Sequence, residues 1–121
     1  MNAGQISKGI IAASAGNHAQ GVALSASKLN INALIVMPTT TPSIKIESVK
    51  KFGVEVLLYG DSFDEAYEHA LKISKKDGRI FIHPFDDPLV IAGQGTVAKE
   101  IVEQSKVVPD IFFIPVGGGG L

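Results

Sequence analysis

Short apolar runs alternate along the chain with longer segments in which apolar residues recur every three or four positions. Continuous apolar character predicts buried strands at 9–13, 31–37, 54–59, 79–82 and 111–114. Helical spacing predicts helices at about 16–30, 42–52, 62–77 and 89–105. Residues 1–8 are polar and carry little information, and we interpret them as the end of a helix. Strands that are apolar on both faces and alternate with helices indicate an α/β fold, in which a parallel sheet is flanked by helices on both sides.

Residue types at the expected helix ends support this division. Oxygen-bearing side chains are expected to cap three of the helices, namely Thr41, Asp61 and Asp87. The apolar contacts of the helix at 42–52 are expected to be Ile44, Val49 and Phe52. A glycine costs about 1 kcal/mol in a helix interior. We therefore expect the last helix to pack closely against another backbone at Gly93 and Gly95.

Two of the predicted strands run into glycine-containing corners. The first corner consists of Ser14, Ala15, Gly16, Asn17 and His18. The second corner consists of Gly117, Gly118, Gly119, Gly120 and Leu121. Ligands of open parallel sheets bind outside the carboxyl ends of the strands, where both corners are predicted to lie. We therefore expect the two corners to form most of one ligand site.

The glycines of the second corner suit an anion, because successive main-chain N–H groups can converge on a phosphate. No Lys-Ser or Lys-Thr pair follows them, so the segment is not a Walker loop. Two simpler alternatives stay open. Ser14 and Asn17 would then only cap the helix that follows, and the glycines would form a flexible tail.

Other polar side chains are weaker candidates for a functional site. His18 is expected to pack or to support a site rather than to catalyse. His69 lies on a charged helix and is expected to be solvated, whereas His83 is expected to shape a turn. Asp86 and Asp87 are expected to cap a helix rather than to act as catalytic acids. No Ser-His-Asp catalytic set can be assigned from the spacing.

Composition excludes several classes of function. A formal net charge of −1 gives no electrostatic reason to expect nucleic acid or a membrane as partner. The absence of cysteine excludes disulfides and thiolate metal sites, and the three histidines lack the spacing of zinc ligands. No apolar run approaches the roughly 20 residues of a membrane helix, and the first residues do not resemble a signal peptide. The expected location is cytoplasmic.

The first corner resembles the Ser-x-Gly-Asn-His motif of pyridoxal-phosphate (PLP) enzymes of the tryptophan-synthase-β fold type. Further segments resemble the same enzymes in the same order, at 33–38, 52–56, 84–88, 91–96 and 116–121. Within this fold type, the sequence most resembles the threonine dehydratases, also called threonine ammonia-lyases. The resemblance covers nearly the whole chain.

The resemblance implies a role for each residue of the two corners. It implies that Asn17 hydrogen-bonds the phenolic oxygen of the PLP ring. It also implies that the PLP phosphate is held by main-chain N–H groups of Gly117, Gly118, Gly119, Gly120 and Leu121. The substrate carboxylate would be bordered by Ser14, Ala15, Gly16 and His18. The implied reaction is deamination of threonine or serine to a 2-oxo acid and ammonia.

Two positions of the motif distinguish the threonine dehydratases from similar enzymes. Ala15 stands where serine racemases carry a second serine that transfers a proton, and alanine has no such proton. His18 stands where O-acetylserine sulfhydrylases usually have threonine. A serine racemase-like PLP enzyme stays open as an alternative.

The chain departs from the family in one important respect. The family's Schiff-base lysine lies upstream of the first corner in a Phe-Lys-x-Arg-Gly-Ala segment, which this chain lacks. We therefore expect a fragment, with 1–83 as the small α/β domain and 84–121 as the start of the large PLP-binding domain. No residue of the chain is expected to be catalytic, and the chain alone is expected to be inactive.

Two further expectations follow from this interpretation. The apolar strand at 111–114 would lack its sheet neighbours, and a net charge near zero would not oppose pairing between copies. We therefore expect a homo-oligomer. The alternative from another functional class is a non-catalytic phosphate-binding α/β module or a degenerate paralogue.

Overall fold

The computed structural model describes residues 3–107, 109–116 and 119–121, with the side chain of Ala3 left out. The chain divides into two compact units, Met1–Ile82 and His83–Leu121. Gly117 and Gly118 of the second corner lie outside the described residues. The two units are described separately below.

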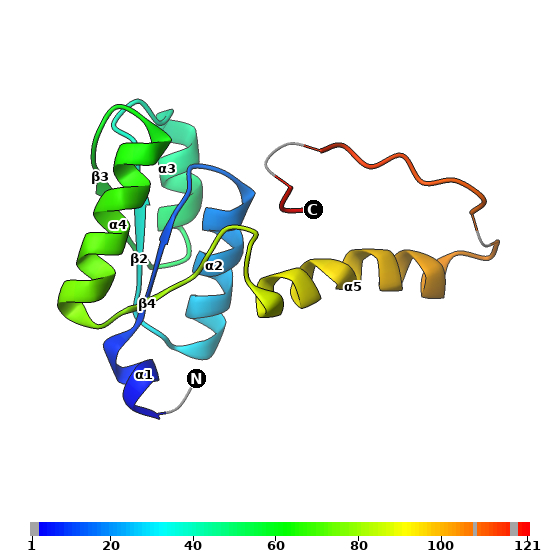
Figure 1. Cartoon of the computed structure of the whole chain (residues 1–121), viewed down its shortest axis with the longest axis horizontal. Helices are drawn as coiled ribbons and strands as arrows, with labels where there is room; N and C mark the ends of the chain where they lie inside the picture. Colours follow the sequence, from blue (N-terminus) through cyan, green and yellow to red (C-terminus); the bar gives the residue numbers. More distant parts are fainter. Residues whose placement is uncertain (1–2, 108, 117–118) are drawn as a thin grey trace. The chain divides into compact units, whose positions relative to one another are not determined.

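The first unit is built on a four-stranded, fully parallel sheet (Figure 1), which confirms the predicted fold class. Its strands are β1 (Ile10–Ala13), β2 (Ala33–Met37), β3 (Glu55–Leu58) and β4 (Ile80–Phe81). Its helices are α1 (Ala3–Lys8), α2 (Asn17–Leu29), α3 (Ser43–Lys50) and α4 (Phe63–Asp77). The strands lie in the order β3-β2-β1-β4, so β1 is an inner strand between β2 and β4.

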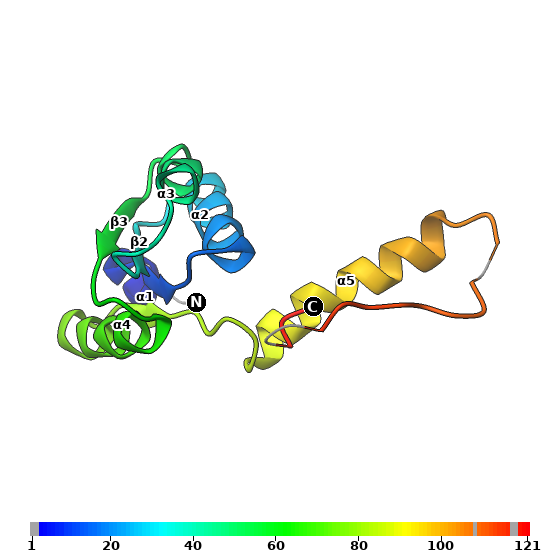
Figure 2. The same ribbon diagram turned by 90° about the horizontal axis from the view of Figure 1, so that it is seen from above.

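Helices cover both faces of this sheet, with α2 and α3 on one face and α4 on the other (Figure 2). Alternate side chains of β1 and β2 point to opposite faces, so both strands are buried along their whole length. The face under α2 and α3 buries Ile10, Ala12, Ala33, Ile35 and Met37. The face under α4 buries Ile11, Ala13, Leu34 and Val36. Burial on both faces explains the continuous apolar runs in the sequence.

Small residues on the helices allow this close packing. α2 places three alanines against the sheet, Ala19, Ala23 and Ala26, and all three are fully or almost fully buried. α4 contributes Ala66 and Ala70 in the same way. A methyl side chain lets a helix lie near the strand backbone without a gap, which preserves the dense packing of a protein interior.

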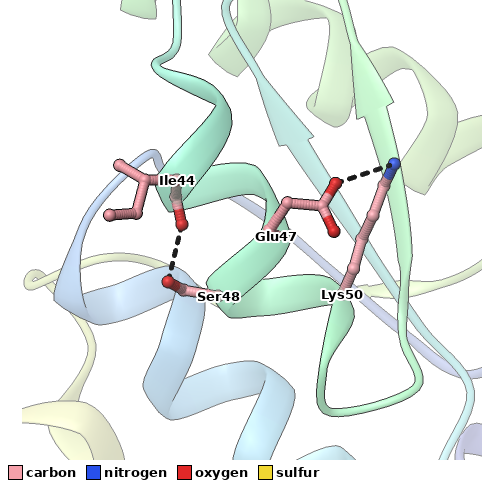
Figure 3. A network of polar contacts seen from close by, with 4 residues as sticks. All are labelled: Ile44, Glu47, Ser48 and Lys50. Atoms are coloured by element: carbon pink, nitrogen blue, oxygen red, sulfur yellow. Dashed lines mark hydrogen bonds and ion pairs between the residues drawn. The ribbon is translucent and has the colours of Figure 1, made fainter.

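α3 presents a different face to the core than its sequence predicts. Val49 is buried and Phe52 packs against the core, as expected, but Ile44 is 75% exposed and Ile46 packs in its place. At 100° per residue, Ile44 lies about 140° around the helix from Val49, so the two cannot face the same side. The carbonyl of Ile44 accepts a 2.6 Å hydrogen bond from Ser48 Oγ within the helix (Figure 3).

The exposed side of α3 carries charge. Glu47 and Lys50 form an ion pair of 3.9 Å whose side chains are both exposed (Figure 3). Exposed pairs of this kind contribute little to stability. The core contacts of Ile46 and Val49 therefore hold this helix in place.

Two of the three predicted helix caps are wrong. α3 begins at Ser43 with Pro42 at the N-cap position and no side-chain cap, while the Thr41 hydroxyl is buried without a hydrogen-bond partner among the described residues. At α4 the N-cap is Ser62, one residue after the predicted Asp61. Asp61 instead accepts a 2.7 Å hydrogen bond from Thr39 Oγ1.

Ser62 and Glu65 form a reciprocal capping box at the start of α4. Ser62 Oγ accepts from the Glu65 N–H at 3.3 Å, and Glu65 Oε2 accepts from the N–H groups of Asp61 and Ser62 at 2.7 and 3.1 Å. The N–H group of Asp61 and then that of Ser62 hold the pKa of the Glu65 carboxyl below its ordinary value. This arrangement satisfies donors that the first turn of a helix leaves free.

The second unit contains one described helix, α5 (Pro88–Gln104). The predicted cap is confirmed, because Asp87 Oδ1 accepts from the N–H groups of Leu89 and Val90 at 2.8 and 3.2 Å. No described residue of α5 is buried. A methyl group added at Gly93 or Gly95 would meet no atom within 4 Å among the described residues, so the predicted close packing there is wrong.

The predicted strand at 111–114 is absent as well. These residues have no regular secondary structure, and their side chains are exposed. A strand is held by hydrogen bonds to a neighbouring strand, and the described residues supply no such neighbour.

Within this unit, a cavity of about 430 Å³ lies among mostly apolar side chains, including Phe85, Ile101, Phe112 and Phe113.

We predict that Ser62→Ala lowers the free energy of unfolding by about 1 kcal/mol, because the Glu65 N–H loses its acceptor. Chemical denaturation of the chain measures this change. Ser25→Ala is the matched control, because Ser25 is an exposed serine within α2, and it should change stability by less than about 0.5 kcal/mol. Equal losses in the two variants would contradict the capping role of Ser62.

The lowered pKa of Glu65 predicts a pH dependence of stability. A depressed folded-state pKa stabilises the protein above the unfolded-state pKa of about 4.3. The stabilisation is lost as the pH falls through the lower folded-state pKa. Glu65→Gln should therefore unfold more easily than the parent chain at pH 7, and the difference should narrow below about pH 4. A difference that is constant from pH 7 to pH 3 would contradict this role.

Candidate functional site

The first corner lies at the point where the strand order of the sheet reverses. From β1 the chain adds β2 and then β3 on one side, and it later returns to place β4 on the other side of β1. The carboxyl ends of β1 and β4 therefore lie side by side where the strand order reverses. Open α/β sheets bind their ligands in the crevice at such a point.

Hydrogen bonds to the sheet and within the loop fix the first corner. Ser14 N–H donates to Val36 O of β2 at 3.1 Å and so extends the strand pairing by one residue. Ser14 Oγ then accepts from the Gly16 N–H at 3.1 Å. Gly16 is the N-cap residue of α2, and no side chain caps this helix. The alternative that Ser14 and Asn17 serve only as caps is therefore wrong.

An uncapped helix start leaves main-chain donors available. The first N–H groups of a helix have no partner within it, and they carry the positive end of the helix dipole. A methyl group added at Gly16 would meet none of the described atoms within 4 Å, so its Cβ position is open in the part of the chain that the structure describes. Asn17 is exposed in the first turn of α2, and its carboxamide can donate and accept hydrogen bonds.

His18 connects α2 to the end of β4. Its Nε2 lies 3.1 Å from the main-chain oxygen of Ile82, and the ring is half-buried. A carbonyl oxygen can only accept a hydrogen bond, so Nε2 carries the proton in this contact. This partner could not be predicted from the sequence, because a main-chain carbonyl has no signature in the residue type that bears it.

The second corner belongs to the other unit. Gly119 has a positive φ of 85°, a conformation that favours glycine. A methyl group at Gly120 would lie 3.4 Å from the carbonyl oxygen of Pro84, which is a tight contact. The predicted meeting of the two corners in one site stays a prediction.

The remaining candidate side chains have structural partners. His83 Nδ1 accepts from the N–H groups of Phe85 and Asp86 at 3.2 and 2.8 Å, which confirms its predicted role in a turn. His69 is not simply solvated as predicted, because it is half-buried and stacks on Tyr59 with ring centroids 3.6 Å apart. Among the described residues, no group of three or more acidic or histidine side chains is arranged to hold a metal ion.

Comparison with known proteins defines the class. The sequence pattern of the pyridoxal-phosphate dependent enzyme family matches residues 2–121. The chain therefore belongs to this family. The structure of the processed form of threonine deaminase isoform 2 from Solanum lycopersicum superposes with a TM-score of 0.88 at 59% identity, covering 99% of this chain and 33% of that one. The structure of maize serine racemase superposes with a TM-score of 0.81 at 36% identity, covering 86% of this chain and 32% of that one.

Two curated relatives extend the comparison. Threonine dehydratase 2 biosynthetic, chloroplastic, of Solanum lycopersicum is 61% identical over 117 residues, which are 97% of this chain. L-threonine dehydratase biosynthetic IlvA of Haemophilus influenzae is 59% identical over 121 residues, which are 100% of this chain. The chain spans 20% and 23% of the lengths of these two relatives.

The described residues fit the cofactor of this family. PLP carries a phosphate group and an aromatic ring with polar substituents, so it needs anion donors and a partner for a ring oxygen. The exposed carboxamide of Asn17 can partner a ring oxygen, and the glycine backbone of the second corner, with its positive φ at Gly119, can present N–H groups to the phosphate. No helix among the described residues has the length and hydropathy needed to cross a membrane.

Two glycines should respond differently to alanine if the first corner is open to a ligand. Gly16→Ala should change the free energy of unfolding by less than about 1 kcal/mol, because its Cβ would meet only open space. Gly9→Ala is the contrasting variant, because its φ is +79° and its Cβ would lie 2.5 Å from Asn32 O. It should cost roughly 1–3 kcal/mol. Comparable losses in chemical denaturation would contradict the open space at Gly16.

Proposed function

We propose that the chain is part of a PLP-dependent threonine dehydratase, which deaminates threonine or serine to a 2-oxo acid and ammonia. The observation that carries the proposal is the first corner, uncapped and open, at the reversal point of the sheet. Identities of 61% and 59% to two threonine dehydratases, over 97% and 100% of the chain, support the choice of reaction.

Main-chain donors of the first corner are proposed to bind the substrate carboxylate. Ser14, Ala15, Gly16 and His18 border the start of α2, where the helix dipole favours a negative charge. Bound in this way, the amino acid is oriented by its carboxylate, and its side chain is left free to be recognised elsewhere. Ala15 carries no hydroxyl that could transfer a proton, which favours elimination over racemisation.

Cofactor contacts are proposed for both corners. Asn17 would hydrogen-bond a ring oxygen of PLP through its carboxamide. The phosphate would be held by the N–H groups of Gly119, Gly120 and Leu121, together with Gly117 and Gly118, which lie outside the described residues. When bound, PLP supplies an electron sink that makes the α-hydrogen of the amino acid acidic.

No residue of this chain is proposed to act as the Schiff-base lysine. Lys8 is the only lysine before the first corner, and its sequence context does not match the family's lysine segment. The 121 residues by themselves are therefore proposed to be inactive, with 1–83 serving as the small domain and 84–121 as the start of the large one. The division of the chain into units after Ile82 is compatible with this proposal.

Assembly and location are also proposals. Leu89, Phe113 and Val116 are 84%, 94% and 82% exposed, and apolar surface of this kind suits burial against more polypeptide. We propose that the whole enzyme is a homo-oligomer.

A cytoplasmic location stays a prediction, since the tomato relative is named chloroplastic.

A chimera tests the proposed reaction. The matching 121 residues of the Haemophilus influenzae relative would be replaced by this chain. We expect the chimera to bind PLP, seen by absorbance, and to convert threonine to 2-oxobutyrate. Asn17→Ala in the chimera should lower kcat/KM about 10- to 100-fold, because the cofactor loses a hydrogen bond that tunes its ring.

Matched controls accompany the chimera. Gln104→Ala removes an exposed amide at the end of α5 and should leave kcat/KM unchanged. The isolated chain, supplied with PLP and threonine, should form no 2-oxobutyrate. A folded, PLP-loaded chimera without threonine turnover would refute the proposal, and racemisation of serine in place of elimination would favour the serine racemase-like alternative.

A further inference from the structure

The end of β4 is held from two directions. β4 is the shortest strand of the sheet, and among the described residues it pairs with β1 alone, through Ile80 and Phe81. Beyond it, the Ile82 N–H donates to Ile11 O of β1 at 2.8 Å. The Ile82 carbonyl oxygen contacts His18 Nε2 at 3.1 Å. The peptide group before Ile82 is therefore hydrogen-bonded to β1, and the peptide group after Ile82 is hydrogen-bonded to α2.

The contact with His18 spans the reversal point of the sheet. Ile82 follows β4 and His18 lies in the first turn of α2, so the imidazole links the segments that follow two adjacent strands. The two residues are 64 positions apart in the sequence. The first corner is fixed on its β2 side by the bond from Ser14 N–H to Val36 O. The contact with Ile82 fixes it on its β4 side.

This contact limits what the imidazole can do. Nε2 acts as the donor to Ile82 O, so this nitrogen is not available to take a proton from a substrate. The main chain of His18 lies in the first turn of α2, a helix that no side chain caps. A ligand at the first corner would meet the backbone of His18, whose position the side chain sets.

We propose that His18 is a positioning residue, which holds the first corner in place through Ile82 so that substrate carboxylate binds there. This inference rests on the proposed function. Loosening the contact should weaken carboxylate binding and leave the proton-transfer steps nearly unaffected. The effect should therefore appear in KM and not in kcat.

Hydrogen exchange on the 121-residue chain tests the contact itself. His18→Met removes the donor at similar side-chain volume, whereas His18→Gln keeps an N–H near the place of Nε2. The Ile82 N–H should exchange roughly tenfold faster in His18→Met and near the parent rate in His18→Gln. The Tyr59 N–H, which donates to Met37 O at 2.9 Å, is the internal control and should not change.

Kinetics of the chimera test the consequence for function. His18→Met should raise KM for threonine roughly 3- to 10-fold and change kcat less than about twofold, while His18→Gln should restore KM. The pH dependence of kcat should be the same in all three proteins. His69→Met is the matched control, because His69 stacks on Tyr59, and it should leave KM unchanged.

Two results would overturn the proposal. Unchanged exchange of the Ile82 N–H in His18→Met would show that the contact does not hold this segment. A fall in kcat of about 10²- to 10⁴-fold in both His18 variants would indicate acid–base catalysis by the imidazole instead. An inactive parent chimera would refute the proposed function, and the exchange measurement on the chain keeps that failure separate from failure of the contact.

Discussion

Burial of β1 on both faces is the constraint on which the rest of the structure depends. All four residues of this strand are buried, and it pairs with β2 on one side and β4 on the other. A shift by one residue would break its register with β2 and β4 and would move its side chains out of the places that they fill in the two packed faces. The point at which the chain leaves β1 is thereby fixed, and the first corner begins at that point.

A site built from main-chain groups follows from this geometry. The open start of α2 offers N–H donors whose directions are set by the helix, and the helix is held by alanines packed against the sheet. Binding then depends on the position of the backbone more than on the reach of side chains. Side chains still act, but Ser14 and His18 do so by bonding to the main chain of this unit.

The sequence predicted the parallel sheet and the place of the first corner, because buried strands and helix starts leave strong local patterns. Prediction of a helix cap from the sequence was wrong where two neighbouring residues can both cap the helix. Asp61 and Ser62 are both good caps, and the positive φ of 68° at Gly60 belongs to the turn that places Ser62 at the N-cap. Prediction was also wrong for the strand at 111–114, because a strand needs a neighbouring strand that can lie far away in the sequence. The contact of His18 with Ile82 could not be predicted, because its acceptor is a main-chain oxygen.

The two units differ in how their halves of the proposed site are supported. The first unit closes its own core around β1 and β2, and this core supports the first corner. In the second unit no described residue of α5 is buried, and apolar side chains line an open cavity beside it. The hydrophobic effect favours covering such a surface with more chain. The proposed substrate-carboxylate donors would thus be preformed in the first unit, whereas the proposed phosphate donors of the second corner would depend on further packing around the second unit.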